Sequence, residues 1–372
     1  MTDWNEVNLR LVSIYNCRPG MVIAKPIYSE QGLVLIAEGT SLTESAIEAL
    51  KRRGISFVYV EDKRLADVEL GDDIPIELRI EATNAIAEIQ EQFFSNDERN
   101  ERVFEGVYVD KLRRALKNLM SEINSMNNVI NLLTNMYTHD SYTFSHSTNV
   151  TLYTLAMAAN LGFNEKQMNE IGIGSMMHDI GKCVVPKHIL NKKGPLEEDE
   201  FELVKMHTEY GFEILRKDPS VSLLSAHCAL QHHEKLDGTG YPRGLKGDEI
   251  HPYGKILAVA DVFDALTSNR PYRKAMLPHE AMEILYGETY THFDPKYVKT
   301  FQRSVATYPV GLTVKLNTGE TGVVVHYEMG APNRPTVRVL NDPTGDSVDK
   351  PYEIDLAKHP SIMITECDAI LT

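Results

Sequence analysis

The first part of the chain mixes short apolar runs with turn residues, a pattern typical of a small α+β module. Residues 43–53 place apolar side chains at helical spacing, with Thr43 as a candidate N-cap and Gly54 as a stop signal. The apolar run at 55–60 predicts a strand. An acid-rich stretch that is typical of a linker comes next. We therefore expect residues 1–73 to form a small regulatory module.

Three further segments differ in the period of their apolar positions. Residues 74–137 show helical spacing, which predicts linker helices whose apolar faces pack on a partner chain in a homodimer. Residues 138–305 form the longest helical block, and eleven of the thirteen histidines lie there, between His139 and His292. Residues 306–372 alternate apolar and polar positions among Gly and Asn turns, which predicts a small antiparallel β unit. The predicted fold class is a multidomain α+β chain with a central all-α bundle, a small N-terminal α/β module and a small C-terminal β unit.

Composition narrows the class of protein. The 372 residues are 42% hydrophobic and 24% charged, which favours folded globular domains over a disordered chain or a membrane bundle. The start of the chain lacks the order of a signal peptide and no apolar run is long enough to span a bilayer, so we expect a cytoplasmic protein. Fifty-three acidic against thirty-eight basic residues argue against DNA or an anionic membrane as the partner. A small anionic ligand stays compatible with this charge, because local cations or metals can outweigh the distant field.

Paired histidines and aspartates carry the candidate chemistry. Residues 165–182 predict a helix with His178 and Asp179 at its buried end. His232 and His233 follow another helical stretch and precede a glycine-rich loop. Either pair alone is also compatible with ordinary hydrogen bonding. Imidazole nitrogens combined with carboxylate oxygens suit iron, manganese, zinc, nickel or cobalt better than magnesium or calcium.

The order of these motifs resembles the HD-GYP family of cyclic di-GMP phosphodiesterases, which are HD-superfamily metal-dependent phosphohydrolases. The resemblance covers about residues 138–304, under half of the chain. It is carried by His178-Asp179-Ile180-Gly181-Lys182, then His207, then His232-His233-Glu234 with Asp237-Gly238 and Gly240-Tyr241-Pro242, then Asp261. The central bundle is therefore expected to be an HD-type domain spanning residues 138–305.

The resemblance implies a role for each matched residue. Two divalent metals, iron or manganese with zinc, nickel or cobalt as alternatives, would be held with Asp179 as the bridge. Lys182 would stabilise the scissile phosphate or protonate the leaving group. The substrate-binding residues would be Arg270 and Arg273, which grip the second phosphate or stack on guanine, with Gly240 and Tyr241 at the pocket mouth. The implied metal ligands are His146, His178, Asp179 and Asp261 for one ion, and His207, His232 and His233 for the other.

One position departs from the pattern. Some members of the family carry a glutamate four residues before the first ligand histidine, where it completes a third metal site. Here that position is Tyr142, whose protonated phenol is a poor ligand. We therefore expect two metals, although Asp140 and Glu234 are candidates for an additional carboxylate ligand.

The implied function is hydrolysis of the bacterial second messenger cyclic di-GMP to pGpG, with further conversion to GMP left open. Two alternatives stay open as well. One is an HD-type hydrolase of another cyclic dinucleotide or nucleotide. The other is a non-catalytic cyclic di-GMP receptor or a scaffold that docks a diguanylate cyclase. The flanking modules show no clustered histidine and carboxylate set, so we expect them to regulate the enzyme.

Overall fold

The computed structural model describes most of the chain. For residues 94, 106–108, 125 and 142–144 it describes the backbone alone. The described residues are 9–29, 33–55, 57–68, 74–94, 106–125, 142–192, 194–268, 276–327, 331–368 and 371.

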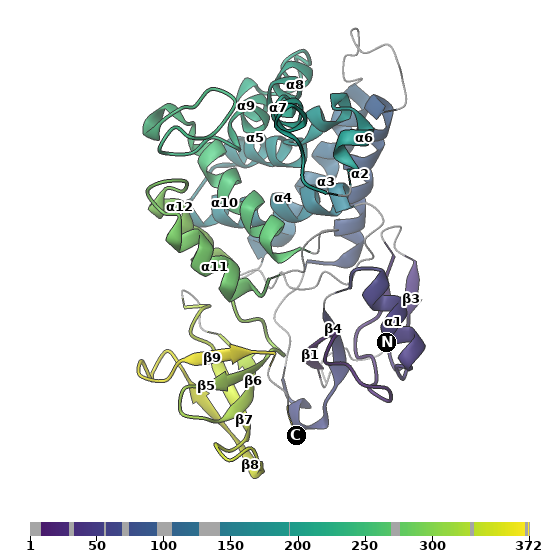
Figure 1. Ribbon diagram of the computed structural model, residues 1–372, viewed down its shortest axis with the longest axis vertical. Helices are drawn as coiled ribbons and strands as arrows, with labels where there is room; N and C mark the ends of the chain where they lie inside the picture. Colours follow the sequence, from purple (N-terminus) through teal and green to yellow (C-terminus); the bar gives the residue numbers. More distant parts are fainter. Residues whose placement is uncertain are drawn as a thin grey trace.

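A helical body occupies the upper half of the view in Figure 1. One continuous buried core joins residues from α2 through α12, including Ile86, Leu116, Leu152, Ile171 and Phe301. Its helices are α2 Ile76–Phe94, α3 Gly106–Ser125, α4 Tyr142–Asn160, α5 Glu165–Met176, η3 Ile180–Val184, α6 Lys187–Leu190, α7 Glu198–Lys205, α8 His207–Leu215, α9 Leu223–Gln231, η4 Gly247–Glu249, α10 Pro252–Thr267, α11 Pro278–Gly287 and α12 Pro295–Ser304.

The apolar faces of α2 and α3 pack inside the chain. Ile86 and Leu116 are fully buried in the common core, and Thr83 of α2 hydrogen-bonds Thr148 of α4. These faces are therefore covered without a partner chain, contrary to the packing that the spacing in residues 74–137 suggested. The expected homodimer stays a prediction.

The N-terminal module contains β1 Leu9–Ser13, β2 Ile27–Tyr28, β3 Val34–Ile36, α1 Glu44–Arg52, β4 Phe57–Glu61 and η1 Lys63–Leu65. The expected N-cap of α1 is confirmed, because the hydroxyl of Thr43 accepts a hydrogen bond from Ala46 N. β1 pairs antiparallel with β4, and β2 with β3. The C-terminal sheet is antiparallel in the order β8, β7, β6, β5, β9. Its strands are β5 Thr313–Leu316, β6 Thr321–His326, β7 Thr336–Asn341, β8 Ser347–Asp355 and β9 Ile364–Cys367.

The two end modules lie next to each other below the helical body in Figure 1 and share a hydrophobic core. Leu11 and Tyr59 of the N-terminal module are buried against Val314 and Val337 of the sheet. Leu11 N also donates to Gly311 O over 2.8 Å. The predicted fold class is confirmed: a central helical bundle, with one small module before it and one after it in the sequence.

Candidate metal centre

Two glycines bring separate parts of the helical body together at the site. A Cβ atom on Gly181 would lie 1.9 Å from the carbonyl oxygen of His207 and 2.5 Å from the backbone nitrogen of Gly211. Only glycine lets η3 approach α8 this closely. The approach places His207 Nε2 at 3.4 Å from Asp179 Oδ1, although the two residues are 28 positions apart.

α5 ends at Met176, earlier than the expected end at residue 182. His178 and Asp179 follow in the turn before η3, and both are fully buried, as the pattern indicated. The turn frees His178 Nδ1 to bond Ser175 O over 2.8 Å. Its other ring nitrogen therefore points into the site.

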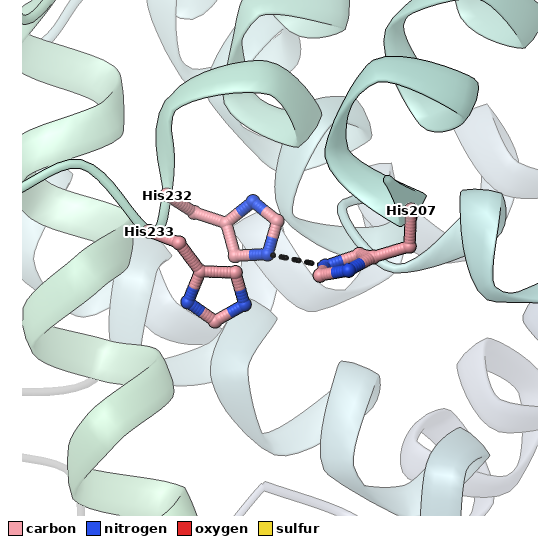
Figure 2. Close-up of side chains that lie close together, drawn as sticks. All are labelled: His207, His232 and His233. Atoms are coloured by element: carbon pink, nitrogen blue, oxygen red, sulfur yellow. Dashed lines mark hydrogen bonds between the residues drawn. The ribbon is translucent and has the colours of Figure 1, made fainter. Parts of the chain in front are cut away.

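Three histidines from α8 and the end of α9 form one cluster (Figure 2). His207 Nδ1 lies 2.6 Å from Val204 O, and His232 Nδ1 lies 2.9 Å from Ala229 O. Because carbonyl oxygens only accept, each Nδ1 carries the hydrogen and each Nε2 presents a lone pair. The two Nε2 atoms face each other at 3.3 Å. His233 completes the group, and one ligand atom from each of the three residues lies within 4.8 Å of the others.

A second cluster lies beside the first and contains His146, His178 and Asp179. Asp179 Oδ2 is 3.4 Å from His178 Nε2 and 3.8 Å from His146 Nε2. Asp261 Oδ1 is 3.1 Å from His146 Nε2, and Asp261 Oδ2 is 3.9 Å from His233 Nδ1. The structure therefore brings together all seven residues that the resemblance implied as ligands.

The unpaired atoms of the site fit a divalent cation. His178 Nε2 and Asp179 Oδ1 are buried and have no hydrogen-bond partner among the described residues. Asp179 Oδ1 instead faces the lone pair of His207 Nε2. Buried acceptors that face one another are costly unless a cation lies between them.

Electrostatics keep most of these groups in the form that binds metal. Burial lowers the pKa of His207 to about 4 and that of His233 to about 3, so both are neutral at pH 7. Burial acts to raise the pKa of Asp179, but Lys182 and His178 outweigh it and hold the pKa well below its usual range. Metal ligands have to be neutral imidazoles and ionised carboxylates, which these residues supply.

His146 is the exception. Burial acts to lower its pKa, but hydrogen bonds to Asp261 and Asp264 outweigh burial and raise the pKa to about 9. His146 Nδ1 lies 2.7 Å from Asp264 Oδ2, and Asn149 Nδ2 donates to the other oxygen of Asp264. Asp264 was not among the residues expected from the sequence. Its position three residues after Asp261, on the same face of a helix, is the signal that would have found it.

The remaining expected residues divide into those near the clusters and those outside the described residues. Lys182 Nζ lies 2.6 Å from Asp179 Oδ2. The Tyr241 ring stacks on His233 with centroids 4.8 Å apart. A Cβ on Gly240 would lie 2.3 Å from Lys235 N, so the loop requires glycine there. Arg270, Arg273 and Asp140, as well as the side chain of Tyr142, lie outside the described residues.

Glu234 uses its carboxylate to stabilise the glycine-rich loop that follows it. Its two carboxylate oxygens accept from Arg243 N over 2.8 Å and from Leu245 N over 2.9 Å. Its side chain is buried in these contacts. This arrangement argues against Glu234 as a source of an additional metal ligand.

Two family models match the chain. Residues 117–297 match the HD domain, and residues 313–370 match the KOW domain associated with HD domain. The cyclic di-GMP phosphodiesterase PA4108 of Pseudomonas aeruginosa is 40% identical over 213 residues, which are 57% of this chain and 51% of that protein.

Two further relatives have related names. The 3'3'-cGAMP-specific phosphodiesterase 3 of Vibrio cholerae is 40% identical over 168 residues, 45% of this chain and 36% of that protein. The cyclic di-GMP phosphodiesterase of Thermotoga maritima is 42% identical over 177 residues, 46% of this chain and 47% of that protein. The chain thus spans about half the length, or less, of these relatives.

The fold, the clustered histidines and aspartates and the family match define the helical body as an HD domain, a class of domain that depends on metal ions. The Gly240-Tyr241-Pro242 loop beside His233 and the similarity to cyclic dinucleotide phosphodiesterases specify the group further. This helical body belongs to the HD-GYP family. None of the helices in the described residues is both long enough and apolar enough to cross a membrane.

Proposed function

We propose that this chain hydrolyses cyclic di-GMP to pGpG with two divalent metals. The observation that carries the proposal is the position of Asp179, which belongs to the second cluster and also faces the first. Its Oδ1 faces His207 and its Oδ2 faces His178, each at 3.4 Å. A carboxylate with one oxygen toward each cluster is suited to bridge two ions. The relatives named cyclic di-GMP phosphodiesterases support the choice of substrate.

The donor set supports iron or manganese, with zinc, nickel or cobalt as alternatives, because it combines imidazole and carboxylate groups. Such ions, when bound, supply a Lewis acid for the phosphate oxygens and an activated water. One set of ligands would be His146, His178, Asp179 and Asp261, and the other His207, His232 and His233, with Asp179 shared.

The chain's own residues would perform the remaining tasks. The Lys182 ammonium lies beside Asp179, where it would neutralise charge on the scissile phosphate or donate a proton to the leaving 3' oxygen. Arg270 and Arg273 would bind the second phosphate or stack on guanine. Gly240 and Tyr241 would shape the pocket mouth. The cytoplasmic location and the docking of a diguanylate cyclase stay predictions.

The metal count follows from Tyr142. With a phenol in place of the glutamate that some members of the family carry, we expect two ions and slow or absent conversion of pGpG to GMP. The Tyr142→Glu variant should gain a third ion by mass spectrometry of the native protein and should release GMP faster. A wild-type protein that already holds three tightly bound ions would contradict this part of the proposal.

A second substrate is supported by one finding, since a relative that is 40% identical is named a 3'3'-cGAMP-specific phosphodiesterase. The two substrates differ in one purine base. Initial rates with cyclic di-GMP, 3'3'-cGAMP and cyclic di-AMP, followed by chromatography, decide between them. We expect the highest kcat/KM for cyclic di-GMP. Faster cleavage of 3'3'-cGAMP would replace the proposed substrate, and binding without cleavage would favour the receptor alternative.

A further inference from the structure

The short helix α7 exposes apolar side chains close to the metal centre. All eight residues of α7 are described, and none of them is buried. Phe201 and Leu203 are each 44% exposed. A short surface helix gains little from exposing two large apolar side chains, so such residues beside a metal centre are candidates for ligand contact.

A row of rings connects Phe201 to the metal centre. The Tyr241 ring stacks on His233 at 4.8 Å with an interplanar angle of 30°. Phe201 meets Tyr241 edge to face, with centroids 6.3 Å apart and an angle of 79°. Phe201 thus lies one ring beyond Tyr241, and His233 belongs to the first histidine cluster.

Lys205 holds this arrangement in place. Its ammonium lies 4.9 Å from the centroid of Phe201 and 5.8 Å from that of Tyr241, and it also bonds Glu202 over 2.5 Å. Cation–π contacts to both rings fix the position of Phe201 relative to Tyr241. A ring that is already fixed loses little conformational freedom when a ligand stacks on it.

We propose that Phe201 is a binding residue that stacks on one purine base of the cyclic dinucleotide; this inference rests on the proposed function. A cyclic dinucleotide carries its two bases away from the phosphates, so a base can reach a ring outside the metal clusters. Aromatic rings bind nucleobases through their faces, and each such contact strengthens binding severalfold to about a hundredfold. The contact is remote from the reacting phosphate and is similar in the ground and transition states, so it affects KM more than kcat.

The test compares Phe201→Ala with a matched control on the same helix. Leu203→Ala removes an equally exposed apolar side chain about 200° around α7. Phe201→Tyr keeps the ring. Each metal-loaded protein is assayed with cyclic di-GMP and with methyl p-nitrophenyl phosphate, a phosphodiester without a nucleobase.

We expect Phe201→Ala to raise KM for cyclic di-GMP about tenfold with kcat within about twofold. Phe201→Tyr and Leu203→Ala should match the wild type, and all variants should cleave methyl p-nitrophenyl phosphate equally. An unchanged KM in Phe201→Ala, or an equal loss with both substrates, would overturn the stacking role while leaving the proposed function intact. A wild-type protein that cleaves only methyl p-nitrophenyl phosphate would overturn the proposed function, and the stacking role with it.

Discussion

His146 and Asp264 lie 2.7 Å apart, Nδ1 to Oδ2, in the buried interior behind the metal clusters. The carboxylate orients the imidazole so that Nε2 faces Asp261 and Asp179. Carboxylates in this position fix the tautomer and raise the basicity of a ligand histidine. Asp264 is thus a positioning residue for a metal ligand.

Replacing Asp264 with asparagine should weaken metal binding about 10- to 100-fold. An amide can donate to Nδ1 and so favour the tautomer that carries hydrogen on Nε2, which blocks ligation. Competition with a fluorescent chelator measures the affinity. The exposed Asp248→Asn variant is the control. Equal affinities in the two variants would show that Asp264 does not orient His146.

Gly181→Ala should destabilise the protein by about 3 kcal/mol, because a Cβ cannot fit 1.9 Å from the His207 carbonyl. The variant should also lose metal, since separation of η3 from α8 moves Asp179 away from His207. Denaturation with urea and metal analysis measure the two effects. Gly194→Ala is the matched control, because open space surrounds that position. A Gly181→Ala protein with wild-type stability would refute the close-packing argument.

The metal-free protein should lose stability as the pH falls from about 6.5 toward 4. The folded pKa of His207 lies below the unfolded value of about 6.5, so the unfolded chain binds more protons in this window. The pKa of His233 is about 3, so protonation of His233 continues the loss of stability at still lower pH. Urea denaturation of chelator-treated protein checks this, and His207→Gln should flatten the acid limb. A stability that is constant from pH 6.5 to 4 would contradict the assigned neutral state.

The opposite sign is expected for His146. Its folded pKa of about 9 lies above the unfolded value, so its contribution is full below about pH 6.5 and is lost as the pH rises through 9. His146→Gln should flatten the alkaline limb of the metal-free stability curve. If that limb is the same in the variant and the wild type, His146 is not held as an imidazolium by its two aspartates.

A fragment of residues 74–305 should fold and bind metal, whereas a fragment of residues 138–305 should not. The shorter fragment lacks Ile86 and Leu116, which complete the common core. It therefore exposes apolar surface on α4 and α5. Circular dichroism and metal analysis of both fragments test this expectation. A folded, metal-loaded 138–305 fragment would show that α2 and α3 are dispensable.

Sequence patterns predicted the parts of the molecule whose signals are local. The capped helix after Thr43 and the alternating strands after residue 312 follow from short-range spacing. The ligand set required the resemblance, because His146, Asp179 and His207 come from two separate helices and a turn, and their spacing alone implies no contact.

Other features depend on tertiary contacts that no local pattern contains. Leu11 on β1 pairs with residue 59 of β4 and also packs on the distant C-terminal sheet. The apolar spacing in α2 and α3 predicted that one face of each helix is buried. It could not show whether the same chain or a partner chain covers that face. The ligand pattern did not predict Asp264, because this carboxylate bonds a ligand histidine and is not itself among the implied ligands.

The most direct test of the account is metal content and cyclic di-GMP turnover of wild type and Asp179→Asn, purified anaerobically. Asp179 faces both histidine clusters, so its replacement should remove the bridge while the fold stays intact. We predict about two ions per wild-type chain with pGpG as the product, and in the variant a loss of metal and at least a 1000-fold loss of activity, roughly 4 kcal/mol in the barrier. A folded Asp179→Asn protein with wild-type metal content and turnover would show that Asp179 does not bridge two metals needed for hydrolysis.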